Sequence, residues 1–394
     1  RHDCKAEGSL GYVCTWRLTL RIRITSMALT TVRPQGMGFN TGRRNLIING
    51  AMQVAQRGTS STLLQIRTCD RWKVQFSGDV TQSQEDLSSS DTPYSFGFRK
   101  ALKLLNTGNA DAAGTYTQAF QIIEAQDVVS SGWNYTSSSS SVTVQFWVKS
   151  SLAGTYTSFL RTADTTSRSF SFDFVLVANT WKLVTVTVPG NSGITINNDN
   201  GAGLELFIVP YYGSQFTTSG HTDDAWQAYS GSDIAGDYAQ NWKNTSSATF
   251  FITGVQIEVG TNASDFEYRS FGEELTLCQR YYYRVGDDNN GGGYHRYAVG
   301  SCQGTSSCGI TVHAPVKMRT TPTLEQTGTA SNYALYEADS VHACTSVPAL
   351  NSTNCSPSNF NITFTSSGNL ASGNAAEAIN NNNTTSFLAF DAEL

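Results

Sequence analysis

Alternation of apolar and polar residues with a period of two constrains the fold of this chain more than any other feature. Such alternation is typical of β-strands that bury one face. Four runs show it, separated by polar turns: Val142 to Val148, Phe170 to Leu176, Val184 to Val188 and Leu204 to Ile208. This spacing predicts an all-β fold, with two sheets stacked over a core about 10 Å thick.

A further strand candidate at 250 to 259 closes the sandwich. Val255, Ile257 and Val259 alternate there with polar residues. A long first half of strands followed by such a closing strand is the order of a jelly roll. We therefore predict a jelly-roll sandwich over residues 62 to 269.

A short helix is predicted directly after the sandwich. Ser270 and Glu273 fit the S-x-x-E capping box of a helix start. Leu275, Cys278 and Tyr282 then recur at helical spacing. The run DDNNGGG that follows cannot continue a helix, so we expect a linker helix over 270 to 286.

A smaller β domain is predicted for residues 287 to 394. Alternating apolar residues occur at 310 to 314 and at 360 to 364, and SFLAFDAEL at the end predicts a last strand. Large apolar residues are few for about 100 residues, which is thin for a separate core. This favours burial against identical chains.

Composition and charge exclude several classes of partner. Only 14% of the 394 residues are charged, and the formal net charge is -5. Nucleic-acid binding needs a basic face, so we expect no nucleic-acid partner. No run of about 18 apolar residues occurs, so we expect no membrane insertion.

Three runs carry a family resemblance: NLIINGAMQVAQRGTSS at 45 to 61, DRW at 70 to 72, and GVQIEVGTNASDFEYRSFGEELTLCQRYYYR from 254 onwards. With APVKMRTTPTL at 314 to 324, they resemble bacteriophage tail-fibre or virion structural proteins of the marine phage type. The large domain resembles a carbohydrate-binding jelly roll. The resemblance implies a homotrimer on the virion that contacts other tail proteins, and it supplies no catalytic residues.

The N-terminal region divides at Met27. Residues 1 to 26 are basic and differ in composition from the rest, and we interpret them as a translation or cloning remnant, or else as a short basic docking arm. Residues 27 to 61 mix Arg, Gly and Asn around one apolar group and are too few to bury a core. We expect them to lie against a neighbour or to attach the chain to the virion.

A long excursion without strand alternation lies between Tyr211 and Asn244. Long loops inside a compact domain are usually functional. Aromatic rings stack on the C–H faces of sugars while polar side chains bond the hydroxyls. The glycan-binding candidates are Trp226, Trp242, Tyr229, Trp133, Tyr211 and Tyr212. The alternative is that these rings pack in the core.

Acidic residues in the same excursion are the best candidates for metal binding or catalysis. Asp223 and Asp224 follow His221, with Asp233 and Asp237 nearby. Such oxygen ligands suit calcium, and paired acids suit glycoside hydrolysis. Solvated turn residues are the simpler interpretation, because no spacing matches a defined ligand loop. No catalytic motif occurs, so we predict no catalytic residues and no cofactor apart from this calcium candidate.

Four of the eight cysteines lie in two local pairs. Cys302 and Cys308 flank one short loop, and Cys344 and Cys355 flank another. These pairs are candidates for disulfides or, with weaker spacing, for a four-cysteine zinc site. Cys69 and Cys278 are expected to be free and buried.

Together these features predict a non-enzymatic tail-fibre protein that binds host-surface glycans through its jelly roll. A purely structural virion protein and a polysaccharide-degrading tail spike are the alternatives.

Overall fold

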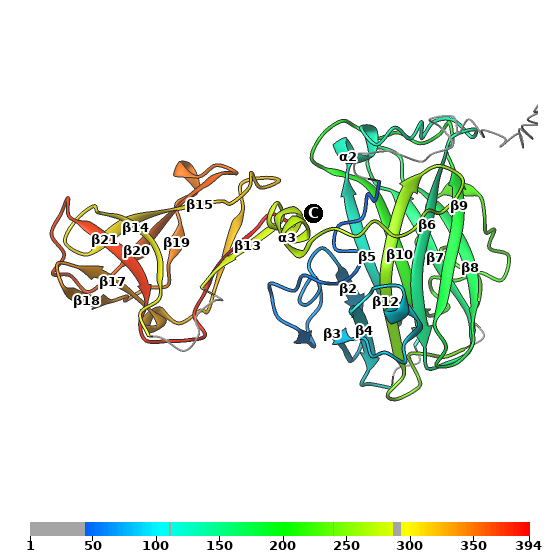
Figure 1. Cartoon of the computed structure of the whole chain (residues 1–394), viewed down its shortest axis with the longest axis horizontal. Helices are drawn as coiled ribbons and strands as arrows, with labels where there is room; N and C mark the ends of the chain where they lie inside the picture. Colours follow the sequence, from blue (N-terminus) through cyan, green and yellow to red (C-terminus); the bar gives the residue numbers. More distant parts are fainter. Residues whose placement is uncertain (1–43, 110–111, 239, 287–292) are drawn as a thin grey trace, which may run out of the picture. The chain divides into compact units, whose positions relative to one another are not determined.

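The first part of the chain is a sandwich of two antiparallel sheets (Figure 1). The structure is a computed structural model that describes residues 44 to 109, 112 to 238, 240 to 286 and 293 to 394. Three parts of the predicted organisation lie outside these ranges: residues 1 to 26, residues 27 to 43 of the predicted attachment segment, and residues 287 to 292. Sheet A has the order β1 (Ser60–Ser61), β3 (Val80–Asp86), β4 (Lys100–Asn106), β12 (Thr249–Val259), β6 (Ser141–Ser150), β9 (Lys182–Pro189). Sheet B has the order β11 (Trp226–Ala228), β8 (Arg168–Leu176), β7 (Gly154–Thr162), β10 (Ala202–Tyr212), β5 (Tyr116–Glu124), β2 (Lys73–Phe76).

The core lies between the two sheets and is built from the alternation that the sequence shows. Val144 and Phe146 of β6 face Phe172 and Phe174 of β8 within one buried cluster. Phe146 and Phe174 meet edge to face, with ring centroids 5.6 Å apart. Burying side chains of this size contributes about 1.5–3 kcal/mol each. The all-β jelly-roll prediction is confirmed, and the five predicted strands correspond to β6, β8, β9, β10 and β12.

The sandwich also has two very short helices, α1 (Thr92–Ser95) and α2 (Ala125–Val129), and α3 (Phe271–Gln279) follows it. The capping box is confirmed, because Ser270 and Glu273 each bond the backbone N–H of the other. The helix ends at Gln279, so the prediction that it includes Tyr282 was wrong. Tyr282 begins strand β13 (Tyr282–Val285), which pairs with the end of the chain. Among the described residues, no helix is long and apolar enough to cross a membrane.

The C-terminal region forms two further antiparallel sheets. The smaller has the order β13, β22 (Leu388–Asp391), β16 (Thr323–Gln326). The larger has the order β18 (Ser340–Ala343), β17 (Tyr333–Glu337), β21 (Ala375–Asn380), β14 (Arg296–Cys302), β15 (Ser307–His313), β20 (Asn359–Thr365), β19 (Ala349–Leu350). Short 3-10 turns occur at Ala330–Asn332 and Ser352–Asn354. Phe360, Phe364, Tyr333 and Phe390 lie in one buried cluster. This region therefore has its own core, and burial against identical chains is not needed to explain it.

An irregular segment at 45 to 50 takes the place of a strand beside β12. β4 pairs only with the first part of β12, from Thr249 to Ile252. Beyond that point, the Leu46 N–H bonds the carbonyl oxygen of Ile257 at 2.9 Å, and the Val255 N–H bonds that of Gly50 at 2.9 Å. A Cβ on Gly50 would lie 2.1 Å from the Val255 oxygen, so this approach requires glycine.

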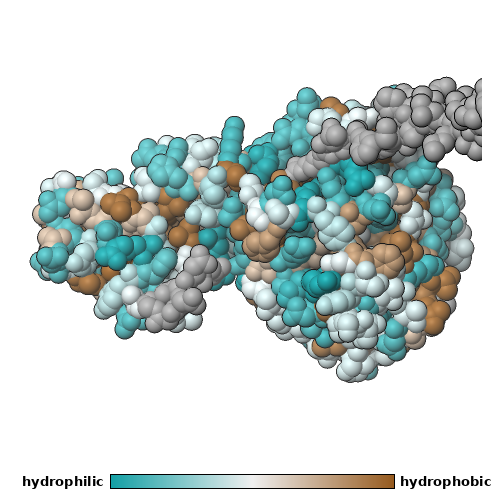
Figure 2. Space-filling model, in the orientation of Figure 1, coloured by the Kyte–Doolittle hydropathy of each residue, from teal (hydrophilic) through white to brown (hydrophobic). Residues whose placement is uncertain are grey.

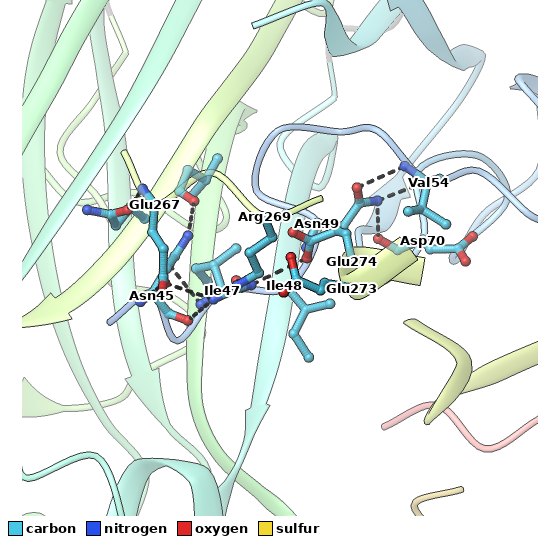
Figure 3. A network of polar contacts seen from close by, with 12 residues as sticks. Asn45, Ile47, Ile48, Asn49, Val54, Asp70, Glu267, Arg269, Glu273 and Glu274 are labelled. Atoms are coloured by element: carbon cyan, nitrogen blue, oxygen red, sulfur yellow. Dashed lines mark hydrogen bonds and ion pairs between the residues drawn. The ribbon is translucent and has the colours of Figure 1, made fainter. Parts of the chain in front are cut away.

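Side chains complete the hydrogen bonding of this segment (Figure 3). The Asn45 amide oxygen accepts from the N–H groups of Ile47 and Ile257, both at 3.0 Å, and its NH₂ donates to the Val255 oxygen at 3.1 Å. Glu274 of α3 accepts from the N–H of Asn49. Buried backbone groups must find such partners. Residues 45 to 54 are thus part of the sandwich, whatever attachment role the preceding residues have.

The DRW run joins the same network. Asp70 accepts from the backbone N–H of Gln56 at 3.0 Å, and its own carbonyl oxygen accepts from Asn49. Arg71 forms an ion pair with Glu393 and lies 3.4 Å from the ring centroid of Tyr281. Trp72 is buried, and its indole N–H donates to the Asn49 oxygen at 3.1 Å. These residues hold the fold together and do not form a surface site.

Asn45→Ala is expected to lower the free energy of unfolding by roughly 2–5 kcal/mol, because it leaves at least two buried N–H groups without partners. Urea denaturation would measure the change. Asn262→Ala is the matched control, since Asn262 is exposed and its amide makes only a 3.5 Å contact to Thr261. Equal stability of the two variants would contradict this account of the segment.

Asp70 is expected to make stability depend on pH. Burial raises the pKa of its carboxyl to about 6, and the attraction of Arg57 only partly offsets this. The folded protein therefore binds a proton that the unfolded chain releases near pH 4. Relative to Asp70→Asn, the wild type should lose unfolding free energy as the pH rises from about 4 to about 6. Denaturation at several pH values would measure this, and a relative gain over that range would show that Arg57 dominates.

Candidate functional site

A groove lies on the outer face of sheet B, on the side away from the core. It has a volume of about 450 Å³. Its walls come from four strands and from the excursion. The lining residues are Lys73, Gln75, Tyr116, Gln118, Phe120, Ile122, Phe159, Arg161, Glu205, Phe207, Tyr212, Phe216, Tyr229 and Ile234. We call it the sheet-face groove.

Three phenylalanine rings form the middle of its floor. Phe207 of β10 is directly opposite Phe120 of β5 and Phe159 of β7. The ring centroids are 4.5 Å apart for Phe120 and Phe207, and 4.4 Å apart for Phe159 and Phe207, and both pairs are stacked. Strand register therefore places a flat aromatic row across three strands.

Polar side chains lie on both sides of this aromatic row. On one side, Arg161 of β7 is opposite Glu205 of β10 and forms an ion pair with it. On the other side, the Gln118 NH₂ donates to Gln75 at 2.9 Å, and the Tyr212 hydroxyl donates to the Gln118 oxygen. Burial raises the pKa of Tyr212, which keeps its hydroxyl protonated. The floor thus has an apolar centre between two hydrogen-bonding rows.

A β-bulge decides which tyrosine reaches the groove. The register of β10 against β5 shifts between Ile208 and Tyr211. Because side chains alternate along a strand, this shift exchanges the faces of the following residues. Tyr211 consequently packs in the core between the sheets, whereas Tyr212 lies in the groove.

The excursion forms the outer wall of the groove. Phe216 and Ile234 from this loop pack with the buried Phe207 and Tyr212. Tyr229 lies beside Arg161, whose guanidinium carbon is 4.9 Å from the ring centroid. Of the six predicted glycan-binding residues, Tyr229 and Tyr212 line the groove.

The other predicted aromatic residues lie elsewhere. Trp242 and Trp133 are buried in the core between the sheets, so neither ring is open to an external ligand. Trp226 is half-buried on the edge strand β11, where its N–H donates to the Pro189 oxygen at 2.6 Å. Its ring packs against Phe170, with centroids 5.7 Å apart. For these three tryptophans, the structure agrees with the alternative interpretation, in which the rings pack in the core.

The acidic residues of the excursion surround His221. Its Nε2 is 2.5 Å from the Ser171 hydroxyl of β8, and its Nδ1 is 2.8 Å from Asp233. The Ser171–His221–Asp233 arrangement resembles a serine nucleophile with its base and an orienting carboxylate. However, only about 1% of the Ser171 residue and of the His221 side chain is exposed, so no substrate reaches the hydroxyl. The contacts attach the excursion to β8.

The predicted calcium ligands do not gather into a metal site. Burial raises the pKa of Asp223, with the nearby Asp173 carboxylate adding to the effect. An Asp carboxyl with a raised pKa is a poorer cation ligand. Among the described residues, no group of three or more His, Cys, Asp or Glu side chains is arranged to hold a metal ion, at Asp224 or elsewhere.

The six described cysteines are free thiols. Cys302 and Cys308 are buried and directly opposite on β14 and β15, but they are not bonded. Cys344 and Cys355 are also unbonded to each other, and the Cys355 thiol is 3.1 Å from the Asn351 oxygen. Cys69 and Cys278 are free and fully buried, as predicted.

Sequence analysis missed most of the groove floor. Phe207 and Glu205 alternate with the core residues Leu204 and Leu206, so β10 has large side chains on both faces. A strand of this kind is covered on both sides. That signal in L-E-L-F-I would have pointed to a second buried face on this sheet.

No family model matches the chain. No curated protein matches it either. Among solved structures, similarity is found to a family 11 carbohydrate-binding module from Clostridium thermocellum, with 11% identity over 51% of this chain and 95% of that chain, and a TM-score of 0.24. The N-terminal cellulose-binding domain of a Cellulomonas fimi β-1,4-glucanase has 8% identity over 54% of this chain and 99% of its own, with a TM-score of 0.27. A tandem carbohydrate-binding domain from Paenibacillus barcinonensis covers 89% of this chain and 97% of its own, with 10% identity and a TM-score of 0.28.

Proposed function

We propose that this chain is a non-enzymatic glycan-binding protein and that its binding site is the sheet-face groove. The observation that carries the proposal is the lining of that groove, where the half-buried rings of Tyr116, Phe216 and Tyr229 lie around a floor with two rows of hydrogen-bonding side chains. A sugar ring has flat C–H faces and a rim of hydroxyls. A binding site for a sugar ring therefore needs apolar contacts to the ring face and polar contacts to the hydroxyls beside it.

The charges of the groove favour neutral or weakly charged glycans. Arg161 and Glu205 neutralise each other in their ion pair. The Lys73 ammonium donates to the Leu394 backbone oxygen at 3.1 Å, so part of its hydrogen-bonding capacity is already used. Apart from this ion pair, a strongly anionic ligand would find Lys73 as the one positively charged side chain of the lining.

The proposed location is the virion, in a tail fibre or similar appendage. The support for this is the resemblance of the runs at 45 to 61, 70 to 72 and 254 onwards. A homotrimer that contacts other tail proteins would present several grooves together. Weak individual contacts to host glycans would then add up through avidity.

One observation favours the alternative of a purely structural virion protein. The floor rings are themselves well covered, since Phe159, Phe120 and Phe207 are all buried beneath the excursion. A ligand would meet mainly the edges of the groove, at Tyr116, Phe216 and Tyr229, which are half-buried. A polysaccharide-degrading role has less support, because its acidic candidates Asp223, Asp224 and Asp237 do not line the groove.

Tyr229→Ala is expected to weaken glycan binding about tenfold, which corresponds to about 1.4 kcal/mol of lost stacking and polar contact. A glycan array followed by titration of the strongest glycan would measure this. Tyr294→Ala is the matched control, because Tyr294 is exposed and lies outside the groove. If correctly folded wild-type protein binds no glycan on the array, the structural role replaces the proposed one.

The proposed trimer predicts a mass near three times 42.7 kDa in light scattering. The measurement should be made with the full chain at micromolar concentration and repeated after dilution. A mass of one chain under these conditions would contradict the trimer but leave the groove and its ligand untouched.

A further inference from the structure

A second hollow lies on the outer face of sheet A, on the opposite side of the sandwich core from the sheet-face groove. Its volume is about 500 Å³. We call it the aromatic hollow. The lining residues that matter here are Phe96, Gln145, Trp147, Asp265, Phe266 and Tyr268. Gln145 and Trp147 point outward from β6, because Val144 and Phe146 between them fill the core.

A bulge in β12 makes room for this hollow. The register of β12 against β6 shifts between Thr253 and Gln256, and Gly254 there has a φ of 62°. A Cβ on Gly254 would lie 2.6 Å from the Phe98 ring and 3.0 Å from the Trp147 ring. The glycine therefore lets the two rings lie against bare backbone at the base of the hollow.

Large apolar side chains are exposed in this hollow, whereas polar side chains are usual on a solvated sheet face. Phe96 is 57% exposed, Tyr268 48% and Leu183 42%, and all three line it. On the face that Figure 2 displays, hydrophobic residues form patches between hydrophilic ones. Large apolar side chains gathered in one hollow are typical of a binding surface.

The rings are held in place by one another and by backbone contacts. Phe96 lies 5.2 Å from Trp147, and Phe266 lies 5.0 Å from Tyr268, between ring centroids. The Tyr268 hydroxyl donates to the Phe96 oxygen. The aromatic surface is thus formed before any ligand arrives, which lowers the entropic cost of binding.

Polar groups stand among these rings. The Asp265 carboxylate is exposed, and it makes no ion pair with the described residues. Trp147 is 9% exposed, and its indole N–H likewise has no hydrogen-bond partner among them. Gln145 is held by its NH₂, which donates to the Ser264 oxygen at 3.0 Å. The hollow therefore offers a hydroxyl-bearing ligand both donors and acceptors.

The charge of the lining disfavours anionic ligands. Asp265 is its one charged side chain, and no Lys, Arg or His contributes to it. Phosphate, sulfate and uronate groups would meet this carboxylate, while the neighbouring Arg44 already donates to the Ser264 hydroxyl and to the Asp265 backbone oxygen. A neutral saccharide, with apolar ring faces and hydroxyl groups, matches the rings and the polar groups together.

We propose that the aromatic hollow is a second glycan-binding site, specific for neutral saccharides. The ligand class rests on the proposed function, but the site is separate from the sheet-face groove. With one site on each outer face of the sandwich, a single chain bridges two glycan strands. Such bridging raises retention on a polymeric surface well beyond either site alone.

The test uses the full chain on a glycan array carrying neutral and anionic glycans, with four proteins. These are the wild type, Tyr229→Ala, Phe96→Ala with Asp265→Asn, and the combination of all three substitutions. Val177→Ala is the matched control, because Val177 is an exposed apolar residue outside both sites. Circular dichroism and melting temperature confirm that each variant is folded.

The inference expects Tyr229→Ala, which weakens binding at the sheet-face groove, to keep the part of the neutral-glycan signal that the aromatic hollow supplies, and the combined variant to lose that remaining signal by at least about tenfold. Bridging is measured by aggregation of glycan-coated beads, which the wild type and Val177→Ala should cause and either single-site variant should not. If Phe96→Ala with Asp265→Asn changes no glycan signal while Tyr229→Ala removes all of it, the second site is overturned and the first stands. If the hollow variant instead changes the mass in light scattering, the hollow is a protein contact and the inference fails. Absence of any glycan signal from the wild type overturns both sites.

Discussion

The hydrogen bonding of the irregular backbone at 45 to 50 is the constraint on which the sandwich depends. This segment occupies a strand position beside β12 without strand geometry, so a regular ladder cannot satisfy its N–H and C=O groups. Asn45 supplies three of the missing bonds, and Glu274 of α3 supplies another. Because the segment is buried, each bond it lost would leave a costly unpaired group. The residues that carry the family resemblance therefore act mainly by stabilising the fold.

Both candidate sites follow from interruptions of regular strand pairing. The bulge in β10 turns Tyr212 outward beside the aromatic row of the sheet-face groove. The bulge in β12 lies next to Gly50, where the irregular segment contacts Val255, and it opens the aromatic hollow at Gly254. A bulge shifts side chains between faces and twists the strand locally. The bulges in β10 and β12 thus determine the shapes of the two candidate sites on the outer faces of the sheets.

Sheet B differs from a simple solvated sheet because both of its faces are covered. Its inner face packs on sheet A, and its outer face carries Phe120, Phe159 and Phe207 beneath the excursion. The contact of His221 with Ser171 attaches the excursion to β8, and Asp233 of the excursion contacts the other ring nitrogen. The excursion is therefore a wall of the groove, and its contacts with the strands, rather than isolated exposed rings, define the surface.

The sequence by itself determined the elements that depend on neighbours along the chain. Alternation predicted β6, β8, β9, β10 and β12, and the spacing of Ser270 and Glu273 predicted the start of α3. Such signals are local, because a strand alternates every second residue and a helix cap spans one turn. The end of α3 was misplaced, since Tyr282 fits helical spacing but pairs instead with Asp391, far along the chain.

Only the tertiary structure decided which aromatic residues line the candidate sites. Tyr211 and Tyr212 are adjacent in sequence, yet a bulge places one in the core and the other in the groove. Trp242 lies in a polar loop sequence but is buried, while Phe207 lies in an apolar strand and forms a groove floor. Composition records that a ring is present, but its exposure depends on what covers each face of the sheet. The residues that cover each face come from strands and loops that are distant in sequence. The register of those strands cannot be predicted from a local sequence pattern.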